Sequence, residues 1–173
     1  MTEAAAQPSV NPEPGGLTLG IDDDRVGVAM TGGDTWNIPL GPVTLSSGEL
    51  SNDPPRPADL TNALGFIHDY FDDIVSAAPS VLATPSVAVT GRHAVALAEV
   101  EVGHRNPPAD YRLRRVDADE VFRTLVAEPR VERRHNPGLA HDAVDTVIGT
   151  LCIVLAVMRR LDLDHVTLLA RTP

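Results

Sequence analysis

Three short apolar runs follow one another near the start of the chain, and turn-forming residues separate each run from the next. The runs are Leu17–Ile21, Arg25–Met30 and Thr35–Leu40. The aspartates Asp22-Asp23-Asp24 separate the first two, and Thr31-Gly32-Gly33-Asp34 separates the second from the third. Alternating apolar residues bounded by Gly and Asp are typical of strands joined by tight turns. We therefore expect an antiparallel meander of three strands over residues 17–40.

The rest of the chain alternates helical and strand-like segments. Apolar residues at helical spacing predict a helix over 57–77, and a strand is expected over 86–90, closed by Gly91. An apolar run over 94–100 predicts a short helix that begins near Gly91 or His93, and a loop follows over 101–111. A helix over 117–127 with a capping-box pattern at its start, a long apolar helix over 141–161 and a strand over 165–169 complete the series. This order predicts an α/β fold: a single actin-like (ribonuclease H-like) domain with a mixed five-stranded sheet flanked by helices.

Composition excludes several classes of function. The chain of 173 residues carries a net charge of -10, which disfavours nucleic acid and anionic membranes as partners. All 14 bases are arginine, so lysine-dependent phosphate loops and Schiff bases are excluded. The single cysteine, Cys152, excludes an internal disulfide and lies within an apolar helix, where a thiol is unreactive. No motif for nucleophilic catalysis or dinucleotide binding is present, and we expect no catalytic residue and no cofactor.

The ends of the chain carry no targeting signal that we can identify. Residues 1–16 are rich in Ala, Pro, Gly and Glu and are expected to form a disordered tail before a domain over 17–173. The longest nearly apolar stretch, residues 147–158, is shorter than the about 20 residues that a membrane helix needs. These features predict a cytoplasmic protein with a reduced core thiol.

Several segments, in this order, resemble the second domain of the exopolyphosphatase/guanosine-pentaphosphate phosphatase family (Ppx/GppA). They are Ile38-Pro39-Leu40-Gly41-Pro42-Val43-Thr44-Leu45; Asn52-Asp53-Pro54-Pro55 before a helix; Val87-Ala88-Val89-Thr90-Gly91; Glu132-Arg133-Arg134 with Pro137-Gly138-Leu139; Val144-Asp145-Thr146-Val147-Ile148; and Asp164-His165-Val166-Thr167-Leu168. The resemblance covers roughly residues 17–169. It implies an actin-like fold that binds a phosphate chain between two domains, with a catalytic glutamate in a first domain that this sequence does not include.

The departures from the family pattern fall on the phosphate-binding loops. Where the family has a glycine-rich loop, this chain has Asp22-Asp23-Asp24-Arg25, and where it has Gly-Thr, this chain has Gly91-Arg92-His93. Glycines matter there because backbone N–H groups must approach phosphate oxygens without intervening side chains. The resemblance therefore implies a fold that has lost its site. Any remaining ligand contact is expected at the former phosphate loops, Asp22, Asp23, Asp24, Arg25, Gly91, Arg92 and His93.

The simplest interpretation of these loops is a solvated surface, and two ligand-binding interpretations remain open as alternatives. The three aspartates offer ligands for a divalent cation if a distant carboxylate such as Asp145 joins them, although we expect no metal. Arg92 offers a bidentate contact to an anion.

The leading hypothesis is a degenerate, non-catalytic Ppx/GppA-like domain that acts as a binding or regulatory protein. The alternative is a phosphatase half-enzyme completed by a partner chain or a dimer mate, and a metal-dependent nuclease is a third possibility. A protein partner or homodimer is expected in either of the first two cases. Because Ile153, Val157 and Leu161 lie on a helix that is apolar on more than one face, we expect the contact surface on that helix, away from the former cleft.

Overall fold

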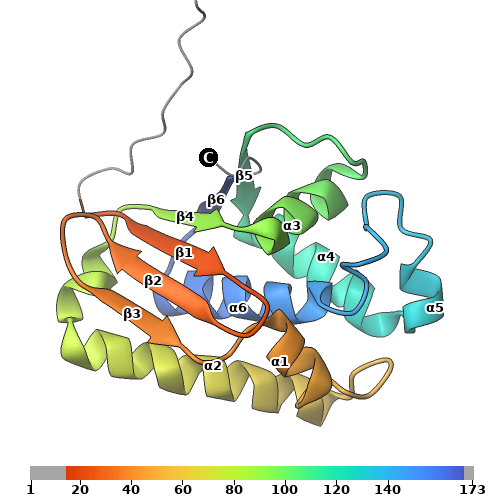
Figure 1. Ribbon diagram of the computed structural model, residues 1–173, viewed down its shortest axis with the longest axis horizontal. Helices are drawn as coiled ribbons and strands as arrows, with labels where there is room; N and C mark the ends of the chain where they lie inside the picture. The colour runs from red at the N-terminus through yellow and green to blue at the C-terminus, as the bar shows by residue number, and fades with distance from the viewer. Residues whose placement is uncertain (1–14, 170–173) are drawn as a thin grey trace, which may run out of the picture.

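The computed structural model describes residues 15–169, and these form one mixed sheet covered by helices (Figure 1). Six strands lie in the order β3-β2-β1-β4-β6-β5. Their bounds are β1 Leu17–Ile21, β2 Val26–Met30, β3 Thr35–Ile38, β4 Val87–Thr90, β5 Asp110–Arg114 and β6 His165–Leu169. The first three strands are antiparallel neighbours, while β1, β4 and β6 run parallel. The α/β architecture and the meander are as predicted.

The predicted number of five strands is wrong: the expected loop over 101–111 covers the first two residues of β5, and no strand is expected over the other three. Pro107 and Pro108 break the segment just before it, and three of its five residues are charged. Apolar and charged residues nevertheless alternate along this strand. Tyr111 and Leu113 turn toward the core, and the three charged residues between and beside them face away. A charged outer row is the usual composition of an edge strand, which β5 is.

The helices are α1 Pro42–Ser47, α2 Pro57–Ala77, α3 Arg92–Val102, α4 Arg115–Ala127, α5 Arg130–Arg133 and α6 Val147–Arg160, with a 3-10 turn over Pro79–Ala83. The expected bounds of α2 are confirmed. Its N-terminus is capped by the Asp59 carboxylate, which accepts a hydrogen bond from the Arg56 backbone N–H at 2.8 Å.

Other helix boundaries differ from the predicted ones. Residues 42–47, for which the sequence indicates no element, form α1, which starts at a proline. The predicted capping box at Asp117 is wrong, because α4 begins at Arg115 and Asp117 binds the Arg114 guanidinium instead. The long helix begins at Val147 and not at 141, since residues 141–146 form turns.

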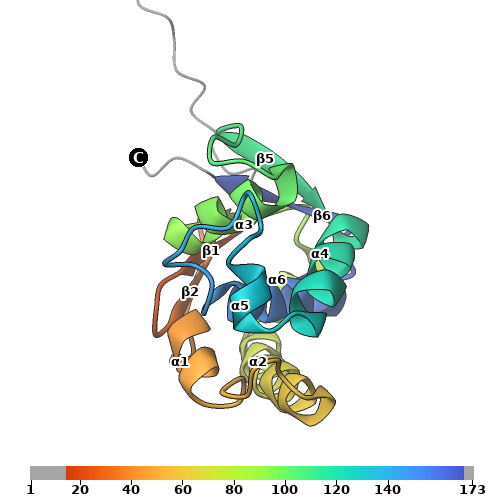
Figure 2. The same cartoon turned by 90° about the vertical axis from the view of Figure 1, so that its right-hand side faces the viewer.

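The core lies between the sheet and the helices behind it. Helix α6 is surrounded by α1, α2, α3 and α4 (Figure 2), and every residue from Val147 to Met158 is buried. Leu19, Val26, Phe71 and Val157 line one small apolar gap, so β1, β2, α2 and α6 meet there. Cys152 lies inside this core, and burial raises the pKa of its thiol to about 12, which agrees with the expectation of an unreactive residue.

Burial of α6 overturns one prediction. Ile153 and Val157 are each only 2% exposed, and Leu161 is buried as well. The surplus apolar surface on this helix is covered by other elements of the same chain, so the helix is not the contact surface that we expected. Among the helices within residues 15–169, none is long and apolar enough to cross a membrane. Apart from Gly15 and Gly16, the predicted tail lies outside the described residues.

Candidate functional site

The two loops expected to make any ligand contact meet at the carboxyl ends of the central strands β1 and β4. Strands β1 and β4 are parallel neighbours, so the residues that follow Ile21 and Thr90 lie side by side. Gly91 has a φ of 101° and lies so close to β1 that a Cβ atom would be 2.6 Å from the Ile21 carbonyl oxygen. Only glycine fits this junction without displacing backbone. The sequence therefore brings Asp22–Arg25 and Gly91–His93 together, as the resemblance implied.

Asp23 ties the two loops to each other. Its Oδ1 accepts hydrogen bonds from Arg92 Nε at 2.9 Å and Arg92 Nη2 at 2.5 Å. His93 Nε2 lies 2.9 Å from the same oxygen. Because an ionised carboxylate only accepts hydrogen bonds, Nε2 carries the proton and donates it. We call Asp23, Arg92 and His93 the Asp23 cluster.

The electrostatics of the cluster follow from its partners and its unequal burial. Hydrogen bonds from Arg92 and then His93 hold the pKa of Asp23 below its usual value of 3.8. The pKa of His93 is lowered from 6.5, chiefly because burial disfavours the charged ring, and Asp23 only partly offsets this. The His93 side chain is 2% exposed, whereas those of Arg92 and Asp23 are about half exposed. At neutral pH the cluster is thus an ion pair supported by a neutral histidine.

The remaining residues of the first loop stay in solvent. Arg25 Nε lies 3.4 Å from Asp22 and 3.8 Å from Asp24, and all three side chains are mostly exposed. The backbone of the turn is held from the other side, since Val43 N–H donates to the Asp23 carbonyl at 2.8 Å. A Cβ atom on Gly41 would be 2.5 Å from that same carbonyl oxygen, so α1 packs directly against the turn. Asp22, Asp24 and Arg25 therefore form an exposed rim.

A pocket of about 240 Å³ adjoins the second loop. Arg92 and His93 line one part of it, and the sequence did not indicate its other charged members, Glu99, Arg105 and Asp142. Glu99 is buried and binds Arg105 Nε at 3.3 Å, while Arg92 Nη1 also lies 3.7 Å from Asp142. Both arginines of the pocket thus already face a carboxylate of this chain. One sequence signal could have indicated that Glu99 is buried: it lies one helical turn after the apolar Val95.

Asp145 does not join the aspartates of the first loop. It forms a two-point ion pair with Arg130, whose Nη2 lies 2.7 Å from Oδ2. The guanidinium lowers the pKa of Asp145. Within residues 15–169, no set of three or more His, Cys, Asp or Glu side chains is arranged to hold a metal ion. The distant partner considered for a divalent cation therefore has a structural partner of its own.

The comparisons with known proteins agree with the fold. No family model and no curated protein matches the sequence. Solved structures do match: the Ppx/GppA phosphatase of Aquifex aeolicus, in its type II variant, superposes with a TM-score of 0.79 at 14% identity over 92% of this chain. An exopolyphosphatase from Cytophaga hutchinsonii gives 0.71 at 20% identity over 90%, and an exopolyphosphatase-like protein gives 0.75 at 18% over 91%.

These neighbours are longer than the present chain. The matched region is 53% or 54% of each of them, so the chain spans about half their length. The structural neighbours are thus Ppx/GppA exopolyphosphatases, and this chain has the fold of one of their domains.

Proposed function

We propose that this chain is a non-catalytic Ppx/GppA-like domain, equivalent to the second domain of that family, that acts as a binding or regulatory protein. The observation that carries the proposal is the Asp23 cluster. Arg92 and His93 begin α3, and the start of a helix together with an arginine is a favourable place for an anion. The anion at this place is the carboxylate of Asp23.

A phosphate group at the same place would meet like charge. Asp23 would have to leave Arg92, and Asp22 and Asp24 lie in the same turn. Two unit charges of the same sign at about 4 Å repel by on the order of 4 kcal/mol at an effective dielectric of about 20. Arg25 already faces two of these carboxylates and offsets only part of this repulsion. The charges of these loops therefore support the proposal that the protein does not bind polyphosphate as a substrate.

Measurement of phosphate release tests the proposal directly. The purified chain is incubated with polyphosphate or guanosine pentaphosphate, with and without Mg²⁺. We expect no turnover above a buffer blank. Turnover that disappears in Asp22→Ala would overturn the proposal, because it would show the aspartates at work in catalysis.

Removal of the internal anion provides a second test. Asp23→Asn removes one negative charge but retains an oxygen that can accept the Arg92 and His93 hydrogen bonds. We expect the affinity for tripolyphosphate, measured by calorimetry, to rise by about fivefold or more. Asp24→Asn is the matched control, since it changes the net charge equally but touches neither Arg92 nor His93. Equal effects of the two variants would show that overall charge, and not the Asp23 contact, governs anion binding.

The alternative function is a phosphatase half-enzyme completed by a partner chain or a dimer mate. It is favoured by the fact that the chain matches little more than half of each exopolyphosphatase. Light scattering on the purified chain, combined with the phosphate-release assay at rising protein concentration, separates the two functions. Activity that rises with the square of concentration would support the half-enzyme. In both cases the proposed setting is the cytoplasm, and the proposed partner is a protein or a second copy, not nucleic acid or membrane.

A further inference from the structure

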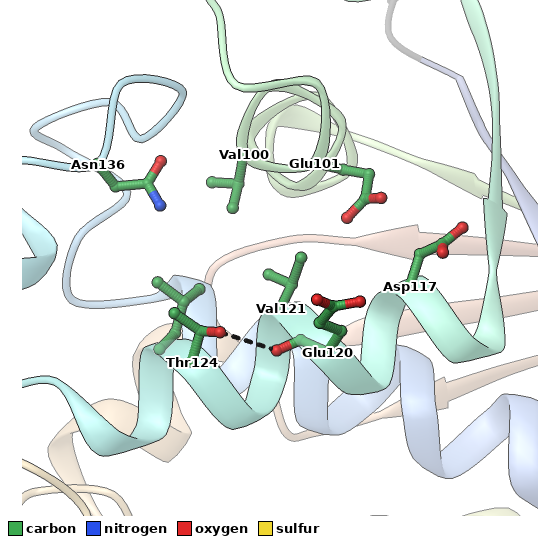
Figure 3. A pocket seen from close by; sticks show the side chains of 8 residues that line it. Val100, Glu101, Asp117, Glu120, Val121, Thr124 and Asn136 are labelled. Atoms are coloured by element: carbon green, nitrogen blue, oxygen red, sulfur yellow. Dashed lines mark hydrogen bonds between the residues drawn. The ribbon is translucent and has the colours of Figure 1, made fainter.

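A second and larger cavity lies between α3 and α4, outside the Asp23 cluster. Its volume is about 330 Å³, which is within the range of small-molecule sites. Figure 3 shows side chains from both helices and from the loop after α5 turned toward this space. The lining residues are Val100, Glu101, Asp117, Glu120, Val121, Thr124, Leu125 and Asn136.

The two ends of the cavity differ in chemistry. Val100 and Val121 project toward each other across it (Figure 3), and the buried Leu125 also lines it. Three carboxylates, those of Glu101, Asp117 and Glu120, lie together on one side (Figure 3). The cavity therefore joins an apolar wall to an acidic end, which is more specific than a group of acids on an open surface.

Two of the three carboxylates have no cation of their own within the described residues. Asp117 binds the Arg114 guanidinium through two hydrogen bonds of 2.6 Å each. Neither Glu101 nor Glu120 forms an ion pair there, and Thr124 donates to the backbone carbonyl of Glu120 and not to its carboxylate. Burial, together with the charges of Asp117 and Glu120, raises the pKa of Glu101. A bound positive charge would relieve this repulsion.

We propose that this cavity binds an organic cation, an ammonium group on a short aliphatic stem, with the nitrogen between Glu101 and Glu120 and the stem against Val100 and Val121. A cation of this kind satisfies both ends of the cavity at once. The ligand is either a free alkylamine or the lysine side chain of another protein. A second copy of this chain cannot supply that side chain, because the sequence contains no lysine.

Titration of the full ¹⁵N-labelled chain tests the site. The two probes are pentylammonium chloride and Nα-acetyl-lysine methylamide, and the controls are ammonium chloride and 1-pentanol, which carry the charge alone and the stem alone. We expect saturable shifts of backbone amides in 100–102 and 117–125 with pentylammonium and no saturation with either control. Saturation by the lysine compound as well would identify a lysine side chain as an occupant, and saturation by pentylammonium alone would identify a free amine. If neither probe saturates these amides, the proposal is wrong.

Variants then separate a specific site from general attraction by an acidic protein. Glu101→Gln and Glu120→Gln should each weaken pentylammonium binding by about fivefold. Glu132→Gln makes the same chemical change at an exposed position outside the cavity and should leave the affinity unchanged. An equal loss in all three variants would overturn the proposal. The test measures no phosphate chemistry, so it fails or succeeds independently of the proposed function.

Discussion

Two groups of charged side chains join distant parts of this chain, and they differ in how deeply an arginine is buried. The Asp23 cluster joins the β1–β2 turn to the start of α3, and its Arg92 side chain is 52% exposed. A second group, which we call the Asp53 cluster, consists of Asp53, Arg130, Arg133 and Asp145. In it the Arg133 side chain is only 6% exposed.

The Asp53 cluster acts as a structural brace. Asp53 accepts hydrogen bonds from the Arg130 backbone N–H at 2.8 and 2.9 Å and from Arg133 Nη2 at 3.2 Å. Arg133 Nη1 donates to the Glu128 carbonyl at 2.6 Å, and Arg130 binds Asp145. The loop before α2, helix α5 and the turns before α6 are thereby held together. Arg133 is the buried arginine of this brace, whereas the Arg92–Asp23 pair is about half exposed. We therefore expect the fold to depend more on Arg133 than on Arg92 or Asp23.

The largest expected effect of a single substitution follows from this difference. Arg133→Ala removes the contacts to Asp53 and Glu128 and leaves a gap in a buried place, so we expect a loss of about 2–4 kcal/mol in the free energy of unfolding. Urea denaturation followed by circular dichroism measures it. Arg134→Ala, at the exposed neighbouring position, is the control and should change stability by less than about 0.5 kcal/mol.

Arg133→Met sharpens the same comparison. Arg133 Nε is the one buried side-chain N or O atom within residues 15–169 without a hydrogen-bond partner. Methionine fills similar space without that unpaired donor, so it should recover more than half of the stability that alanine loses. Equal losses for alanine and methionine would show that the charge contacts, and not the packed stem, carry the contribution of Arg133.

The fold was predictable where the local signal and the tertiary structure agree. The period-2 runs gave the meander, and the helical stripe gave the bounds of α2, because these elements bury one face each. Strand β5 was missed because its charged edge residues hide a two-residue apolar pattern. The contact surface expected on α6 was wrong because four other helices cover it, and a sequence pattern does not show which elements pack against a helix.

For the candidate site, the sequence predicted which two loops lie next to each other, but not which side chains in them form contacts. The resemblance placed Asp22–Arg25 beside Gly91–His93, and the parallel pairing of β1 with β4 confirms that neighbourhood. The pairing of Asp23 with Arg92 depends on side-chain directions that the sequence does not encode locally. The brace from Asp53 to Arg133 spans 80 positions, so no spacing rule indicates it. Gly138 has a steric reason that the sequence does not show, because a Cβ atom there would collide with the Glu99 carbonyl.

A pH series distinguishes the Asp23 cluster from the brace through His93. The pKa of His93 is below 6.5 in the folded chain, so the unfolded chain takes up a proton first as the pH falls. The free energy of unfolding should therefore decrease from about pH 7.5 toward pH 5. Asp23 adds to this at lower pH, since its pKa is below 3.8 and its stabilising pairing is lost as the pH falls through that lowered value.

His93→Gln should flatten the stability profile between about pH 7.5 and pH 5, because glutamine does not titrate. Thermal melts at matched ionic strength measure the change. His141→Gln, at an exposed position, should leave the slope as it is in the parent chain. A parent profile that is flat over this range would contradict the argument that His93 is held neutral by burial.

The smallest expected effect belongs to Asp23 itself. Asp23→Asn keeps an oxygen for Arg92 and His93 and removes only the charge of a half-exposed pair, and such pairs contribute at most about 1 kcal/mol. We therefore expect a loss of less than about 1 kcal/mol in the free energy of unfolding, and a still smaller loss at high salt. A loss as large as that of Arg133→Ala would mean that the Asp23 cluster is also a brace, and that its contacts stabilise the fold. A small loss would mean that the carboxylate contributes little to folding, so that any gain in anion affinity in the same variant reflects what Asp23 excludes from Arg92.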